Sequence, residues 1–150
     1  MTTMEQADVP PAALWLGRAG LIPFIGLALA TLATEAETKH LALRLLEGYG
    51  VVILSFMGGC RWGFAAAGLG EGPRIVPLAI AVLPALFAWA VAELPTPYDL
   101  CALAFGFMLL FVADVKLTEQ QGAPIWWPRL RLPLTSGAAL SLFAGAGATM

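Results

Sequence analysis

The sequence predicts an all-helical integral membrane protein, a bundle of five transmembrane helices in a single domain. Of its 150 residues, 59% are hydrophobic and 12% are charged, whereas charged residues make up roughly 25% of an ordinary soluble domain. The mean hydropathy is +0.81. Five apolar stretches approach the about 20 residues that a helix needs to cross the apolar part of a bilayer. Helices are expected because lipid offers no partner for unpaired backbone groups and the alternation typical of a transmembrane barrel is absent.

Chemically distinct breaks separate the five stretches. A charged segment around Glu37 follows the first stretch, and a Gly-rich turn that ends at Pro73 follows the second. The other two breaks contain Pro95 and Pro97, and Pro128; a proline stops a helix because it lacks an N–H and its ring clashes with the preceding turn. No linker is long enough for a second domain. The predicted spans cover residues 12–34, 45–68, 75–91, 98–117 and 130–150.

The basic residues predict the orientation. With five spans, the N-terminus shares one side of the membrane with the second and fourth connections. The other side holds Lys39 and Arg44. Cytoplasmic loops carry an excess of Lys and Arg, so we expect a multi-pass protein of the bacterial inner membrane with its N-terminus in the cytoplasm. The side of the N-terminus holds six of the eight basic residues: Arg18, Arg61, Arg74, Lys116, Arg129 and Arg131.

Composition also limits the chemistry. A formal net charge of -2 lacks the basic footprint of nucleic-acid binding, so no nucleic-acid partner is expected. His40, Cys60 and Cys101 are too few ligands for a zinc site, a bis-histidine haem or an iron–sulfur cluster. The two cysteines fall in opposite leaflets, which disfavours a disulfide. No catalytic constellation is recognisable, and Asp114 and Glu47 have no visible catalytic partner. We therefore expect no metal, no cofactor and no enzymatic activity.

Three charged residues lie at least three residues inside the cytoplasmic ends of the predicted spans: Arg18 in the first, Arg61 in the second and Asp114 in the fourth. An unpaired charge near the bilayer centre costs at least about 2.5 kcal/mol. In one interpretation both arginines extend to the lipid headgroups. In the other, Asp114 forms a buried pair with Arg18 or with Arg61, which satisfies both charges.

Small residues recur at four-residue spacing, which allows close helix contact without a hydrophobic driving force. We expect packing inside the bundle, with a dimer face as the alternative. Pro23 should kink the first helix. The repeats are Ser55, Gly59, Gly63 and Ala67 in the second span, Gly26, Ala30 and Thr34 in the first, and Gly137, Ser141 and Gly145 in the fifth.

Residues 124–135 are the most distinctive stretch of the sequence. Trp126 and Trp127 are followed by Arg129 and Arg131, and the segment contains the prolines Pro124, Pro128 and Pro133. Tryptophans favour the membrane interface, and arginines bind lipid phosphate or carboxylate. The segment is either an interfacial anchor for the fifth helix or a specific headgroup or ligand site.

The chain resembles a family of small, uncharacterised membrane proteins of bacteria that has a mitochondrial form in eukaryotes and is known as a domain of unknown function. The resemblance covers nearly the whole chain. It implies a multi-pass membrane protein and supplies no established catalytic residue. The residues that carry it lie in segments 16–24 (LGRAGLIPF), 53–63 (ILSFMGGCRWG) and 124–135 (PIWWPRLRLPLT).

From these observations we expect a non-enzymatic accessory or assembly protein that binds a larger membrane complex or anionic lipid, with homo-oligomerisation as a further possibility. The alternative is a small-molecule binding or transport protein with a pocket between the helices lined by Trp and Arg. An open polar cavity at mid-membrane depth would favour the alternative. The candidate site residues are Arg18, Arg61, Trp62, Asp114, Trp127, Arg129 and Arg131.

Overall fold

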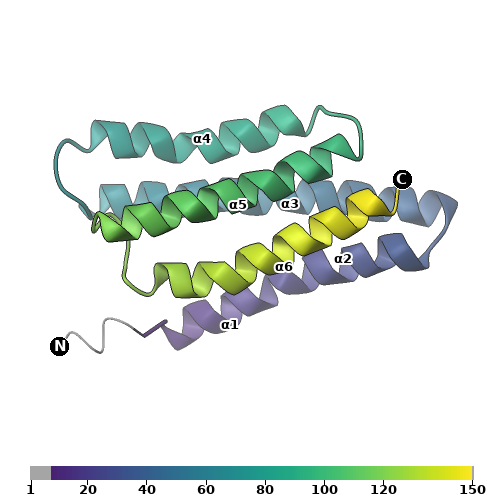
Figure 1. The fold of residues 1–150 in the computed structure, drawn as a ribbon, viewed down its shortest axis with the longest axis horizontal. Helices are drawn as coiled ribbons and strands as arrows, with labels where there is room; N and C mark the ends of the chain where they lie inside the picture. The colour runs from purple at the N-terminus through teal and green to yellow at the C-terminus, as the bar shows by residue number, and fades with distance from the viewer. Residues whose placement is uncertain (1–7, 150) are drawn as a thin grey trace.

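The computed structural model describes residues 8–149, and within them all regular structure is helical. The helices run up and down as an elongated bundle (Figure 1). The start of α1, the α3–α4 loop and the α5–α6 loop lie at one end, and the end of α6, the α2–α3 loop and the α4–α5 loop lie at the other. The elements are α1 Pro11–Ala19, α2 Leu21–Ala33, α3 Ala36–Ala66, α4 Ile75–Val91, α5 Tyr98–Glu119 and α6 Trp127–Gly147.

Four of the five predicted spans differ from the structure in their boundaries, and the third span, 75–91, coincides with α4. The first span divides into α1 and α2. The second begins at Ala36 rather than residue 45, the fourth continues to Glu119, and the fifth begins at Trp127. The final residue of the predicted fifth span, Met150, lies outside the described residues.

A break at Gly20 separates α1 from α2. Pro23 follows three residues later and cannot donate a backbone hydrogen bond. Tyr49 Oη donates a hydrogen bond of 2.9 Å to the carbonyl oxygen of Gly20. The expected kink is therefore present, and a side chain of α3 holds it in place.

The start of α3 shows why the charged break was misplaced. Residues 36–44 are helical, with Ala42 and Leu43 buried and with Glu37 and Arg44 exposed. This apolar stripe continues the buried face of the helix, so the segment stays helical although it is charged. Charge alone did not mark a loop here.

The core contains aromatic and aliphatic side chains from five helices, including Ala88 and Val91 of α4. Phe24 of α2 lies edge to face with Tyr49 of α3 and Phe107 of α5, at centroid distances of 4.9 and 5.8 Å. Leu54, Leu100, Leu103 and Leu142 are also fully buried. These contacts hold α2, α3, α5 and α6 together around the centre of the bundle.

The prediction that the small residues of α3 pack against another helix is partly wrong. Gly59 and Gly63 are exposed, and a Cβ on either would meet nothing within 4 Å. The close approach is instead at Gly58, where a Cβ would lie 2.7 Å from the carbonyl oxygen of Ala81 in α4. In the first span, Gly26 also faces open space.

The pattern in α6 is confirmed as a packing face. A Cβ on Gly137 would lie 2.8 Å from Leu21, and one on Gly145 would lie 2.6 Å from Leu46. Ser141 between them is buried. Glycines therefore let α6 approach both α2 and α3 closely.

Gly58→Ala should therefore lower the free energy of unfolding by roughly 1 to 3 kcal/mol, because the new methyl group overlaps a backbone oxygen. Gly59→Ala is the matched control, and it should raise stability by a few tenths to about 1 kcal/mol, because alanine is the better helix former. Unfolding of both variants in detergent measures the difference. Equal stabilities would contradict the packing of α3 on α4.

The outer surface of the bundle is apolar. Exposed large side chains include Leu29 on α2, Val52 on α3, Leu83 on α4, Leu109 on α5 and Leu140 on α6. Among the described residues, three helical stretches are long and apolar enough to cross a membrane: Pro11–Ala33, which joins α1 and α2, Glu37–Ala66 and Tyr98–Glu119. Ile75–Val91 is a shorter apolar helix. Such a surface is that of a protein embedded in lipid rather than dissolved in water.

Two loops meet at the end of the bundle where α1 begins. Gly68 and Gly70 in the α3–α4 loop have φ of +84° and +86°, a conformation that glycine adopts without strain. A Cβ on Gly70 would lie 3.4 Å from the Cα of Gly122 in the α5–α6 loop. The two loops thus contact each other over the ends of α3, α5 and α6.

Candidate functional site

A buried ionic cluster joins three helices below these loops. Arg61 Nη1 of α3 lies 2.8 Å from Asp114 Oδ1 of α5, and Arg131 Nε of α6 lies 2.9 Å from Asp114 Oδ2. The exposed fractions of the side chains are 11% for Arg61, 2% for Arg131 and 1% for Asp114. One carboxylate therefore binds two guanidinium groups away from solvent.

The three residues meet because each lies close to the same end of its helix. Arg61 lies five residues before the end of α3, Asp114 five before the end of α5, and Arg131 four after the start of α6. At about 1.5 Å per residue, they share a depth of about 6 to 8 Å. Thr118 Oγ1 also donates a hydrogen bond of 3.0 Å to the backbone oxygen of Asp114.

The cluster carries one surplus positive charge, because two arginines share one aspartate. Low dielectric strengthens the attraction within it but also makes an unbalanced charge costly. An arginine keeps its charge at all relevant pH values. The cluster is therefore suited to bind a further negative charge.

Arg131 is incompletely paired. A guanidinium and a carboxylate often form two parallel hydrogen bonds. Here only Asp114 Oδ2 accepts a hydrogen bond from Arg131, because Oδ1 accepts one from Arg61. As a result Arg131 Nη2 is buried without a hydrogen-bond partner among the described residues. Trp127 Nε1 and Thr135 Oγ1, one helical turn to either side of Arg131 on α6, are unpartnered in the same way.

Trp127 packs against the cluster. Its ring lies 5.9 Å from Arg131 Cζ, within cation–π range. Phe64 of α3 contacts it edge to face at 5.0 Å, and Trp126 lies at 5.9 Å. These contacts fix the ring while its N–H stays unsatisfied, so Trp127 Nε1 and Arg131 Nη2 are two buried donors without a partner among the described residues.

The structure brings together Arg61, Asp114, Trp127 and Arg131 of the predicted site. The Arg61–Asp114 pair is confirmed. The alternative pair of Arg18 with Asp114 is wrong, because Arg18 is exposed on α1 and makes no ion pair within residues 8–149.

The other two predicted residues lie apart from the cluster. Trp62 is 49% exposed and Arg129 is exposed. Trp62 directly follows Arg61, and Arg129 lies two residues before Arg131. The turn of the helix nevertheless directs them to other sides of α3 and α6. They face the outside of the bundle.

The sequence analysis missed Arg131 as the second partner of Asp114. A usable signal was the four-residue repeat of Trp127, Arg131 and Thr135, which places three polar side chains on one helix face. In α3 the corresponding signal was Gly58 and Ala65, which share a face with Arg61 and are buried. Both patterns were obscured because apolar residues occur all around these helices.

A second buried acid, also missed, lies at the opposite end of the bundle. Asp99 is 1% exposed in the first turn of α5. Its Oδ2 accepts a hydrogen bond of 2.9 Å from Thr96 Oγ1, and its Oδ1 accepts one of 2.7 Å from the backbone N–H of Leu100. These contacts satisfy the first turn of α5, which gives Asp99 a local structural role.

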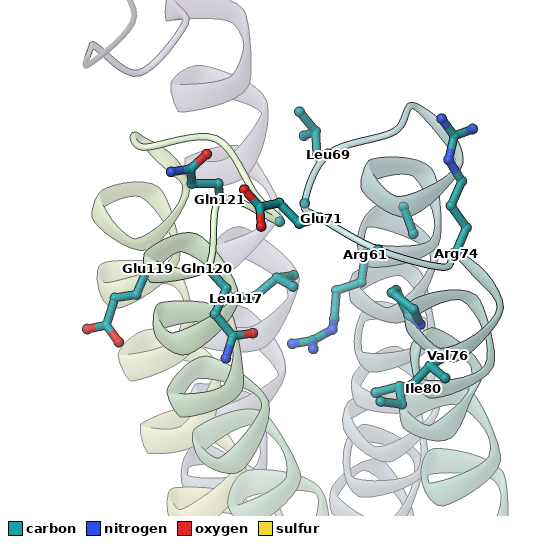
Figure 2. Close-up of a pocket in the computed structure, with 15 residues that line it drawn as sticks. Arg61, Leu69, Glu71, Arg74, Val76, Ile80, Leu117, Glu119, Gln120 and Gln121 are labelled. Carbon is teal, nitrogen blue, oxygen red and sulfur yellow. The ribbon is translucent and has the colours of Figure 1, made fainter.

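Two hollows border Arg61. A polar pocket of about 590 Å³ lies beneath the two loops and is lined by Arg61, Glu71, Arg74, Gln120 and other residues. Figure 2 shows Arg61 extending from α3 into this pocket, with Arg74 at its rim. An apolar groove of about 770 Å³ lies between α4 and α5, and Arg61 also lines it.

A third hollow lies on the other side of the cluster. This cavity of about 320 Å³ is bounded by α1, α2, α3, α5 and α6 and is lined by Phe24, Cys60, Trp127, Arg131 and other side chains. Within residues 8–149, His, Cys, Asp and Glu form no group of three that could hold a metal ion. Cys60 and Cys101 are both free thiols.

Residues 9–147 match the family described as "Protein of unknown function (DUF3429)". The chain belongs to the DUF3429 family. Transmembrane protein 69 of Xenopus tropicalis is 35% identical to this DUF3429 chain over 136 residues, which cover 90% of the chain and 53% of that protein. The mouse (Mus musculus) protein of the same name is 38% identical over 137 residues, which cover 89% of the chain and 55% of that protein.

This DUF3429 chain thus spans about half the length of the two relatives. No solved structure matches it. The names of the relatives and the apolar helices agree that it is a membrane protein.

Proposed function

We propose that this protein is a non-enzymatic, five-span protein of the bacterial inner membrane that binds an anionic phospholipid at Arg61 and serves a larger membrane complex as an accessory subunit. One observation carries the proposal: Arg61 lines both the polar pocket and the apolar groove. A phospholipid has a phosphate and an acyl chain joined at one point. Its phosphate can contact Arg61 from the pocket while one chain lies between α4 and α5.

The charges favour an anionic headgroup. Glu71 and Glu119 also line the pocket, but both are exposed, and exposed charges are screened by salt. The surplus positive charge of the buried cluster is screened much less. A lipid with a net negative charge should therefore bind better than a zwitterionic one.

The ionic cluster supports a binding role rather than a chemical one. Asp114 is the only carboxylate in the cluster, and both its oxygens bind guanidinium groups. The two arginines thus occupy the oxygens that proton transfer would use. The cluster instead holds Arg61 in position at the pocket.

Lipid retention tests the proposal. Native mass spectrometry of protein from nanodiscs with equal phosphatidylglycerol and phosphatidylcholine should show mainly bound phosphatidylglycerol. Arg61→Gln should lower its retention about tenfold, because a hydrogen bond to a charged group contributes roughly 1.5 kcal/mol or more. Arg18→Gln is the matched control, since Arg18 lies outside the pocket. Equal retention of both lipids, or an equal effect of the two variants, would refute the proposal.

The orientation has its own test. Arg18 in α1, Arg74 before α4, Lys116 near the end of α5 and Arg129 near the start of α6 belong to one end of the bundle, whereas Lys39 and Arg44 lie in the first part of α3, toward the other end. A phosphatase reporter fused after Met150 should be active, because the C-terminus is expected outside the cytoplasm. An inactive phosphatase together with a bright cytoplasmic fluorescent reporter at the same position would contradict five spans or their direction.

A further inference from the structure

The cavity between α1, α2, α3, α5 and α6 is separate from the proposed phospholipid site. Apart from Cys60, Trp126, Trp127 and Arg131, its lining side chains are apolar. A volume of about 320 Å³ lies at the lower end of the range for small-molecule pockets. The cavity therefore suits a small or slender apolar molecule.

Two unsatisfied donors belong to residues that line this cavity. They are Arg131 Nη2 and Trp127 Nε1, both buried without a partner among the described residues. An unpaired buried donor is costly, and inside a membrane no bulk water offsets it. Both groups donate and neither accepts, so a matching ligand must bring an acceptor.

We propose that this cavity binds an apolar molecule whose polar end is an acceptor oxygen, either a carbonyl or a carboxylate, held by Arg131 and Trp127. The surplus positive charge of the Arg61–Asp114–Arg131 cluster makes a carboxylate the better ligand. Thr135 Oγ1 is also unpartnered but does not line the cavity, so it takes no part. This site does not depend on the phospholipid proposal, because it uses the other face of the cluster.

Cys60 provides a local reporter. It lines the cavity, whereas Cys101 lies at the start of α5, at the other end of the bundle. In a Cys101→Ala background, the rate at which N-ethylmaleimide modifies Cys60 is measured in detergent with three probes of similar length. These probes are decanoate, methyl decanoate and decane.

Decanoate should slow the modification of Cys60 at the lowest concentration, methyl decanoate at a higher one, and decane not at all. Trp127→Phe keeps the ring but removes the donor, and it should raise the decanoate concentration for half protection about fivefold, as expected for one lost hydrogen bond. Trp62→Phe, outside the cavity, should leave it unchanged. Protection by decane equal to that by decanoate, no protection by any probe, or no effect of Trp127→Phe would overturn the proposal.

Arg74 separates this result from the phospholipid proposal. It lines the polar pocket and not the cavity. Arg74→Gln should therefore leave protection of Cys60 by decanoate unchanged. If Arg74→Gln weakens the protection as much as Trp127→Phe does, decanoate binds at the phospholipid site and the cavity proposal is wrong.

Discussion

Asp114→Asn should lower the free energy of unfolding in detergent by roughly 3 to 5 kcal/mol, because it leaves buried cations without their counter-charge. The change is nearly isosteric, so packing is preserved. Two guanidinium groups depend on this one carboxylate, at 2.8 and 2.9 Å. The loss should therefore be at the upper rather than the lower end of that range.

Double-mutant cycles identify the partners of Asp114. Cycles with Arg61→Gln and with Arg131→Gln should each show a coupling of roughly 0.5 to 3 kcal/mol, because removal of a cation relieves part of the damage. Arg18→Gln is the control and should show none. Coupling with Arg18 alone, or zero coupling throughout, would contradict the cluster.

Phe24→Ala should cost roughly 3 to 5 kcal/mol, because it opens a large cavity in a packed interior. The Phe24 ring is 1% exposed and contacts Tyr49 and Phe107. Its loss removes dispersion contacts that lipid cannot replace inside the bundle. Chemical unfolding of the purified variant measures the effect.

Leu29→Ala is the control on the same helix. Leu29 is 59% exposed at the outer surface, where lipid contacts a leucine in the folded and the unfolded chain alike. Its truncation should cost less than about 1 kcal/mol, as is usual for surface positions. Similar losses for Phe24→Ala and Leu29→Ala would contradict the inward orientation of Phe24.

The sequence predicted the helical class and the third helix well, because apolar length and prolines mark helices strongly. It was harder to predict which side of each helix faces the inside of the bundle. Gly58 and Gly59 differ by one residue, which is about 100° of rotation, and a lipid-facing side is as apolar as a packed side. Hydrophobicity therefore could not decide which glycine faces α4.

The site was predictable in part for a related reason. A buried charge needs a partner, so the depths of the charges in the spans predicted a pair of Asp114 with Arg18 or Arg61, and the structure shows the pair with Arg61. Arg131 was assigned to an interfacial segment because the fifth helix was expected to begin at residue 130. With α6 beginning at Trp127, Arg131 lies inside the helix and reaches Asp114. The start of the helix three residues earlier than predicted thus explains why Arg131 forms a buried contact with Asp114 rather than a contact with lipid headgroups.

The contact between Arg61 and a lipid phosphate can be measured directly by solid-state NMR. Protein with ¹⁵N-labelled arginine in phosphatidylglycerol bilayers should show strong ³¹P–¹⁵N dipolar coupling at the guanidinium signal of Arg61, which Arg61→Gln identifies by its absence. Hydrogen bonding of the phosphate to Arg61 predicts this coupling. Strong coupling at Arg18 or Arg129 with none at Arg61 would contradict it.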